Sequence, residues 1–248
     1  HDPPAPASML PLTSDAINTD QVGWWPLTET DDYASGAADI SGNSYGGTKN
    51  GTITSESASL GTVANFDGST GYFQYSNTLA QSFTDAFSVS FWARPDNDTS
   101  DQRAVSNWYV SSPSNAQWIV WYDIGDGAKG WTAVVKDSSG ADNYAGRTTD
   151  SGVINEWQHV CVTWSSSSTD ILVYVDGVEV ASGTASTMNS STSSTSFEIG
   201  RLPNLSQFFN GDIANVRVWS RVLSADEVWS IYANPWLGSN YKLASGST

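Results

Sequence analysis

Hydrophobic and polar residues alternate over 157–164 (WQHVCVTW). A period of two predicts a β-strand, because successive strand side chains point to opposite faces. A β-branched and aromatic run over 171–175 ends at Asp176-Gly177, and an apolar return run begins at Val178. Asp-Gly between apolar runs is typical of a type I′ hairpin turn, whose two central residues both have positive φ. This stretch therefore predicts three strands, at 157–164, at 171–175 and from 178 on, and a hairpin turn joins the second to the third.

The same pattern predicts strands along most of the chain. Segments rich in Val, Ile, Phe, Tyr and Trp are separated by Gly, Asp, Asn and Ser, which favour turns. Both faces of the central strands have apolar groups, as expected where a sheet packs on another sheet. The pattern thus predicts an all-β, two-sheet antiparallel β-sandwich. Its expected strands also include 22–27, 62–66, 71–75, 87–94, 104–109, 117–123, 130–136, 196–201 and 209–219.

One short C-terminal helix is predicted after the last strand. Ser224 and Glu227 have the spacing of a capping box. In this motif the Ser side chain accepts from a backbone N–H three residues on, and the Glu side chain reaches back. Asn234-Pro235 predicts where the helix ends, because the residue before a proline disfavours helical backbone. The helix is therefore expected over 225–232.

The two ends of the chain lack this pattern. Residues 1–20 are Pro-rich and without periodicity, which predicts an extended arm. The arm has apolar side chains at Met9, Leu10, Leu12 and Ile17, and we expect these to dock on a neighbouring protein subunit. The remaining chain divides into one sandwich domain at 21–236 and an irregular tail at 237–248.

The charge balance limits the expected partners. The chain has 26 acidic and 10 basic residues and a net charge of −16. Nucleic acids and anionic membrane surfaces favour clusters of Lys and Arg, so neither is expected as a partner. No stretch approaches the ~20 apolar residues of a spanning helix, so membrane insertion is not expected either. The single cysteine, Cys161, excludes an intrachain disulfide.

The order of the motifs resembles the laminin-G-like domains of the concanavalin A-like lectin and glucanase superfamily, of the phage or bacterial type. Residues 231–236 (IYANPW) resemble the endings of such proteins in bacteriophages. W-x-H-V-x-V-T-W followed by L-x-V-Y-V-D-G is similar to the central hairpin of that family. Residues 63–68 (VANFDG), 87–95 (FSVSFWARP) and 209–227 (FNGDIANVRVWSRVLSADE) resemble its other strands and its helix. The resemblance implies a jelly-roll sandwich that often binds calcium and usually recognises glycans or proteins. A minority of the wider superfamily are glycosidases or polysaccharide lyases.

The resemblance also implies a Ca²⁺ site. Asp39 in D-I-S-G-N is similar to the family's calcium loop, where a carboxylate and a nearby carbonyl, here that of Gly42, supply oxygen ligands. The family's second ligand segment, I-D-[DE]-V-R, reads I-A-N-V-R in this chain and puts Asn215 at an acidic position. Asp212 could compensate for the missing charge. The alternative is a turn held by Asp39 alone, without a metal.

The chain has 12 tryptophans, which must fill a core, line a binding face, or do both. Aromatic rings offer flat apolar faces to the C–H faces of sugars, while nearby acids and amides bind the hydroxyl groups. The alternative is that most of these rings are in the core, because alternation does not say which sheet face is wet. The candidates for a carbohydrate-binding platform are Trp108, Tyr109, Trp121, Trp131 and Tyr144.

No pattern of catalytic residues is apparent. A glycosidase of the superfamily would place paired carboxylates on one strand face, but the 6 glutamates are scattered singly. His159, the only histidine besides His1, lies in the strand motif and is expected to be structural. The chain also lacks a phosphate-binding loop, a dinucleotide fingerprint and a zinc-type Cys/His cluster. We therefore expect no enzymatic activity.

These observations favour a non-catalytic binding or structural module. The preferred setting is a surface-displayed subunit of a larger assembly such as a virion, homo-oligomeric or held by other subunits through the arm, with glycans as further partners. One alternative is a free secreted calcium-dependent lectin or carbohydrate-binding module. The other is a polysaccharide-degrading enzyme of the same superfamily. The expected location is extracellular or on a virion surface.

Overall fold

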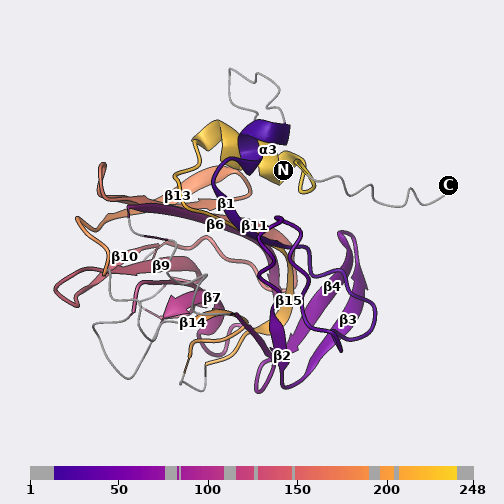
Figure 1. The fold of residues 1–248 in the computed structure, drawn as a ribbon. Helices are drawn as coiled ribbons and strands as arrows, with labels where there is room; N and C mark the ends of the chain where they lie inside the picture. The colour runs from indigo at the N-terminus through magenta and orange to yellow at the C-terminus, as the bar shows by residue number, and fades with distance from the viewer. Residues whose placement is uncertain are drawn as a thin grey trace.

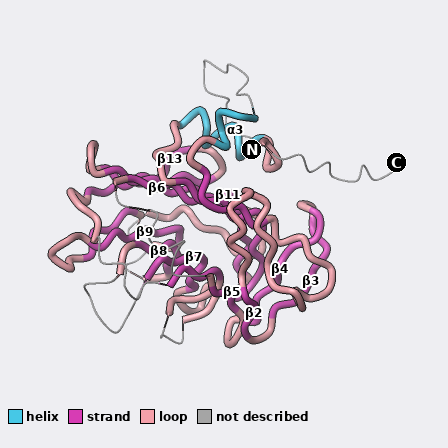
Figure 2. The backbone as a smooth tube through the Cα atoms, viewed as in Figure 1, coloured by secondary structure: helices cyan, strands magenta, loops and turns pink. Residues whose placement is uncertain are grey.

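The protein is a β-sandwich in which two antiparallel sheets lie face to face, with helices on one outer side (Figures 1 and 2). The predicted sandwich with one C-terminal helix is confirmed. No described helix is long and apolar enough to cross a lipid bilayer. The computed structural model describes residues 14–75, 83, 85–108, 116–125, 128–146, 149–189, 196–203 and 207–238.

The larger sheet has eight strands within the described residues, in the order β13-β12-β11-β6-β15-β4-β3, with β1 pairing β15 beside this path. The predicted hairpin joins β12 to β13, and Asp176 and Gly177 have φ of 50° and 79°, as a type I′ turn requires. The strands of this sheet are β1 (Gln21–Trp25), β3 (Ile53–Ala58), β4 (Gly61–Asp67), β6 (Ala86–Pro95), β11 (Gln158–Ser165), β12 (Asp170–Val175), β13 (Val178–Thr184) and β15 (Asn210–Trp219).

The smaller sheet has seven described strands in the order β10-β9-β8-β7-β14-β5-β2. The sequence pattern does not predict β2, β10 or, in the larger sheet, β3. All three are edge strands of their sheet, with a neighbouring strand on one side only. Their sequences are polar (TKN, DNYA and ITSESA). The strands of this sheet are β2 (Thr48–Asn50), β5 (Tyr72–Gln74), β7 (Gln102–Trp108), β8 (Trp118–Asp123), β9 (Gly130–Lys136), β10 (Asp142–Ala145) and β14 (Ser196–Ile199).

The main core lies between the two sheets. Trp118, Val120 and Tyr122 of β8 point into it, as do Val160 and Val162 of β11, and all five side chains are buried there. Alternate residues of the same strands face outward. The period of two in the sequence therefore separates the core from the outer faces, as the sequence predicts.

Helix α3 (Ala225–Ala233) begins with the predicted capping box. The Glu227 N–H donates to Ser224 Oγ at 3.2 Å, and the Ser224 N–H donates to Glu227 Oε2 at 2.8 Å. The helix buries Val228 and Ile231 in a second apolar cluster on the outer face of the larger sheet. It therefore covers that face from the side opposite the main core (Figure 1).

The N-terminal boundary differs from the prediction. Residues 14–20 are not an extended arm, because Ser14–Asn18 form the short helix α1, which lies beside α3 (Figure 1). Ile17 is buried in the same cluster as α3, and its carbonyl accepts a hydrogen bond from Trp219 Nε1 at 2.7 Å. Ile17 therefore packs on its own domain and is not available for the expected contact with another subunit.

The C-terminal boundary also extends further than 236. Arg217 Nη1 donates to the Leu237 carbonyl at 2.9 Å, and Asn18 Nδ2 donates to the Gly238 carbonyl at 2.8 Å. These bonds hold both ends of the domain on the larger sheet. The predicted arm up to residue 13 and the tail from residue 239 lie outside the described residues.

Candidate functional site

We call the outer face of the smaller sheet the open face, because no described helix lies over it, in contrast to the outer face of the larger sheet (Figure 1). Alternation in β8 turns Ile119 and Trp121 outward, where they form a small apolar cluster with Val134 of β9 and Leu202. This cluster is the only described patch of buried apolar side chains on that face, and it forms the floor of a pocket.

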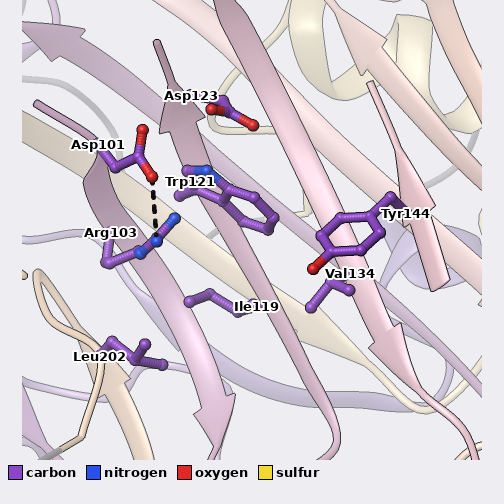
Figure 3. Close-up of a pocket in the computed structure, with 8 residues that line it drawn as sticks. All are labelled: Asp101, Arg103, Ile119, Trp121, Asp123, Val134, Tyr144 and Leu202. Atoms are coloured by element: carbon purple, nitrogen blue, oxygen red, sulfur yellow. Dashed lines mark hydrogen bonds and ion pairs between the residues drawn. The ribbon is translucent and has the colours of Figure 1, made fainter. Parts of the chain in front are cut away.

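The pocket has a volume of about 180 Å³. Its residues come from four neighbouring strands, β7 to β10, and from the segments before β7 and after β14, so its shape depends on the register of the sheet. Figure 3 shows apolar side chains along the floor, with charged groups and Tyr144 around them. The lining consists of Asp101, Arg103, Ile119, Trp121, Asp123, Val134, Tyr144 and Leu202.

Two aromatic rings meet at the pocket. Tyr144 is 37% exposed, and its ring centroid lies 6.2 Å from that of Trp121 at an interplanar angle of 78°. Trp121 is 5% exposed and lies deeper. Edge-to-face packing of this kind fixes the orientation of both rings. Tyr144 therefore provides a partly exposed aromatic surface at the rim of the pocket, and its ring is oriented by packing on Trp121.

Arg103 lies beside these rings from strand β7. Its guanidinium carbon is 4.6 Å from the Trp121 ring centroid, Nη2 contacts Asp101 Oδ2 at 3.2 Å, and Nε donates to Gln207 Oε1 at 3.0 Å. Burial lowers the pKa of Arg103, while Asp101 and Asp123 act in the opposite direction. The guanidinium stays charged, because arginine is not deprotonated in proteins.

Several buried donors around the pocket have no hydrogen-bond partner among the described residues. They are Arg103 Nη1, Trp121 Nε1 and Thr132 Oγ1, and Thr132 pairs with Trp121 across β8 and β9. Buried polar atoms are nearly always satisfied in native proteins, by protein, water or ligand. An oxygen atom entering from the pocket could satisfy donors of this kind.

The structure brings together only part of the predicted aromatic platform. Trp121 and Tyr144 line the pocket, and Trp108 packs at the edge of the same apolar cluster with Lys136 Nζ 5.3 Å from its ring centroid. The prediction for Trp131 is wrong, because it is fully buried between the sheets, where its ring packs on Phe91 and Tyr122. Tyr109 lies outside the described residues.

Sequence reasoning missed the charged residues of the pocket. Arg103 and Trp121 face each other because β7 and β8 pair in that register, with a bulge between Arg103 and Val105. A bulge shifts the side-chain alternation by one position, and the period of two then no longer tells which residues face out. Asp123 could have been predicted, because the period of two that turns Ile119 and Trp121 outward also turns Asp123 outward.

Asp39 does not fit the calcium site that the resemblance implies. One carboxylate oxygen accepts from the N–H groups of Trp24 and Ser41 at 3.0 and 2.9 Å. The other accepts from the Ser41 hydroxyl and the Tyr45 N–H, both at 2.9 Å. A carboxylate has about four lone-pair directions, and all four are used by the protein. Asp39 thus organises a turn, the alternative that the sequence left open.

Two of the other expected ligands, Asn215 and Asp212, also have protein partners. Asn215 Oδ1 accepts from Trp24 Nε1 at 2.6 Å. Asp212 is buried, receives Asn65 Nδ2 at 2.8 Å, and pairs with Arg94 at 2.5 Å. Gly42 lies in the exposed turn after Asp39. The described residues contain no cluster of three or more His, Cys, Asp or Glu side chains around a common point. The residues present do not fit a calcium site.

His159 lies far from the pocket, under α3, beside Trp92 and Tyr232. It is buried, its Nε2 lies 2.8 Å from Ser90 Oγ, and its backbone N–H donates to Asp176. Burial lowers the pKa of His159 to about 3, with a further contribution from the charge of Arg217. The imidazole is therefore neutral at physiological pH, in agreement with a structural histidine.

A match to a family model gives the class of protein. A family model described as the concanavalin A-like lectin/glucanases superfamily matches residues 67–229. The chain belongs to this family, through its laminin-G-like branch, and the resemblance seen in the sequence is confirmed. A search of curated proteins by sequence finds no match.

Solved structures share the fold at low sequence identity. Domain 4 of AbnA, a GH43 extracellular arabinanase from Geobacillus stearothermophilus, in complex with arabinotriose, has a TM-score of 0.66 and 20% identity, over 86% of this chain and 98% of that one. The receptor-binding domain of botulinum neurotoxin C/D mosaic serotype has a TM-score of 0.65 and 14% identity, over 89% of this chain. The binding domain of botulinum neurotoxin DC in complex with SialylT has a TM-score of 0.64 and 12% identity, over 88% of this chain. The chain spans about half of each toxin domain, 52%.

Proposed function

We propose that this protein is a non-catalytic glycan-binding module and that it binds a sugar in the pocket on the open face of the smaller sheet. The observation that supports this most is the pairing of exposed Tyr144 with the apolar floor around Trp121. A sugar ring has an apolar C–H face and a rim of hydroxyl groups. The pocket offers both kinds of surface within one small space.

The chemistry of the pocket matches such a ligand. Ile119 and Val134 form apolar contacts from below, and Tyr144 offers a ring at the side (Figure 3). Arg103 supplies donors, and Asp101 and Asp123 supply acceptors for hydroxyl groups. Pockets for drug-sized ligands have volumes of about 300–1,000 Å³. A pocket of about 180 Å³ suits a smaller unit, such as one sugar ring of a longer glycan.

The structural neighbours support this proposal at the level of the fold. One is described in complex with arabinotriose, and another in complex with SialylT. A shared fold does not establish a shared function, so the argument depends on the pocket itself. The arabinanase is described as extracellular, which supports an extracellular location for this chain as well.

The pocket favours binding over catalysis. A glycosidase needs one carboxylic acid and a second carboxylate on either side of the scissile bond. Here Asp101 is engaged by Arg103 and by the Ile124 N–H, and Asp123 accepts from the Gly125 N–H at 2.9 Å. Incubation with a broad polysaccharide panel should therefore give no new reducing ends. Turnover that is lost in Asp101→Asn or Asp123→Asn would contradict a non-catalytic role.

Binding to a printed glycan array, followed by titration calorimetry, tests the proposal. Tyr144→Ala should weaken binding about tenfold, or about 1.4 kcal/mol, because the exposed ring is lost. Tyr232→Ala is the matched control, since it removes a tyrosine from α3 on the opposite side of the sandwich. Equal binding by the Tyr144 variant and the wild type would contradict the proposed site. The particle setting expected from the sequence stays a prediction, since most of the arm lies outside the described residues.

A further inference from the structure

We infer that this pocket selects neutral sugars over acidic ones and that Asp101 sets the preference. The inference rests on the proposed function, because it names the class of glycan that the pocket would take. Among the lining residues, Asp101 and Asp123 are carboxylates and Arg103 is the only cation. The lining therefore has one excess negative charge.

Arg103 already has a carboxylate partner in Asp101. Its Nη2 is engaged by Asp101 at 3.2 Å, its Nε by Gln207, and its plane lies over Trp121. A ligand carboxylate or sulfate that reached the remaining donor, Nη1, would lie beside two like charges, those of Asp101 and Asp123. Like charges disfavour each other most in sites with little water, where screening is weak.

A neutral sugar meets no such conflict. A hydroxyl group can donate to Asp101 or Asp123 and accept from Arg103 Nη1, which has no partner among the described residues. One hydroxyl group can therefore donate to a carboxylate and accept from the guanidinium at the same time, which an ionised acidic group cannot do. The pocket matches a ligand that both donates and accepts, which is the chemistry of an uncharged sugar.

The surrounding face strengthens the same preference. Two other basic side chains on the outer face of the smaller sheet are also paired with carboxylates, Lys136 with Asp142 at 2.6 Å and Arg201 with Glu198 at 2.8 Å. The whole chain has a net charge of −16. A negatively charged glycan would therefore approach a negative protein without meeting an unpaired cation at these positions.

The test uses an array in which each neutral oligosaccharide is printed beside its sialylated, uronate or sulfated counterpart. Wild type should bind neutral members at least tenfold more tightly than their acidic counterparts, with the gap narrowing as salt screens the repulsion. Asp101→Asn removes the excess charge and releases Arg103, so acidic counterparts should gain at least fivefold. Asp170→Asn is the matched control, since it changes the net charge equally at an exposed position of β12 in the other sheet.

Each outcome decides a different point. Equal binding of both glycan classes by wild type, or tighter binding of acidic members, would overturn the inference while the proposed function stands. If folded wild type binds no glycan on the array, both fall. If Asp101→Asn and Asp170→Asn shift the preference alike, overall charge sets it and the assignment to Asp101 is overturned. The wild-type comparison needs no variant, so a poorly folding Asp101→Asn protein would not prevent the decision.

Discussion

The two outer faces of the sandwich both contain an arginine stacked on tryptophan, but they use it differently. On the face covered by α1 and α3, Arg217 lies between Trp24 and Trp219, 3.9 and 4.9 Å from their ring centroids. On the open face, Arg103 lies over Trp121 at 4.6 Å. The same pair of side-chain types therefore occurs once under a helix and once beside a pocket.

The partners of the two guanidinium groups differ. Arg217 is 1% exposed and donates to the Leu237 carbonyl and, at 3.4 Å, to Asn18 Oδ1. No carboxylate pairs with it within the described part of the chain, and burial lowers its pKa to about 9. Arg103 has a carboxylate partner and a donor left over. Arg217 thus joins residues 18 and 237 to the sheet, whereas Arg103 keeps one donor, Nη1, that no described residue uses.

The two arginine stacks differ in how many of their hydrogen-bond donors the protein itself uses. A stacked arginine whose donors reach only backbone and amide oxygens holds segments together. A stacked arginine with a spare donor, a carboxylate and a cavity beside it can recognise a polar ligand. An arginine stacked on tryptophan can therefore have either role. What distinguishes the two is whether all of the arginine's donors already have acceptors within the protein.

Removing each arginine should separate the two roles most strongly. Arg217→Ala should lower the free energy of unfolding by about 3 kcal/mol, because it leaves a cavity between two indoles and a carbonyl without its donor. Arg103→Ala should lower it by only about 1 kcal/mol, since its ion pair is partly exposed. Urea titration followed by tryptophan fluorescence measures both values. Glycan binding should be lost in the Arg103 variant alone.

A further variant tells packing from charge on the covered face. Arg217→Met keeps most of the stacked volume and removes a buried cation that has no carboxylate partner. Replacing a buried charge by an apolar side chain of similar size is often close to neutral, so the cost should stay within about 1 kcal/mol. A loss as large as that of Arg217→Ala would show that the guanidinium bonds, rather than the volume, hold the chain ends.

The pH dependence of stability gives the next largest effect, again on the covered face. His159 has a pKa of about 3 in the fold, against 6.5 for an unperturbed histidine, because it is buried and near Arg217. The unfolded chain therefore binds a proton below pH 6.5 that the folded chain does not. Stability from this group is complete above pH 6.5 and falls as the pH drops, by about 2 kcal/mol between pH 6.5 and 5.

Urea unfolding at pH 7.5, 6.5 and 5 tests this dependence in wild type and in His159→Gln. Glutamine retains an amide that can reach Ser90 but does not titrate, so the variant should lose most of the pH dependence above pH 5. Its stability at pH 7.5 should be lower than that of wild type. Parallel curves for the two proteins would mean that other groups cause the acid sensitivity.

Much of the fold could be predicted because its signals are local. The Asp176-Gly177 turn and the Ser224–Glu227 capping box each need only a few neighbouring residues, and both are present in the structure. The edge strands β2, β3 and β10 could not be found this way. Their polar sequences become strands only because a partner strand supplies the hydrogen bonds.

The site was harder to predict than the fold. Trp121 and Trp131 both lie in apolar strands, and composition does not tell the floor of a pocket from the core. Their roles are set by register, which places Trp131 opposite the inward-facing Tyr122 and Trp121 opposite Arg103. Ile17 likewise gave no periodic signal, since its burial depends on Trp219, about two hundred residues away along the chain. Contacts across such separations depend on the whole topology.

The smallest expected effect concerns calcium, and it tests whether the covered side of the molecule needs a ligand at all. A native-state site at a calcium concentration one hundred times its Kd would add about 2.7 kcal/mol, equivalent to a rise in Tm of roughly 5–10 °C for a chain of this size. Asp39 has four internal donors, and Asn215 is bonded to Trp24. We therefore expect Tm to change by less than about 1 °C between EDTA and excess Ca²⁺, measured by calorimetry with Mg²⁺ as the control cation. A fall of several degrees in EDTA, reversed by Ca²⁺ and absent in Asp39→Asn, would mean that Asp39 exchanges its hydrogen bonds for the metal.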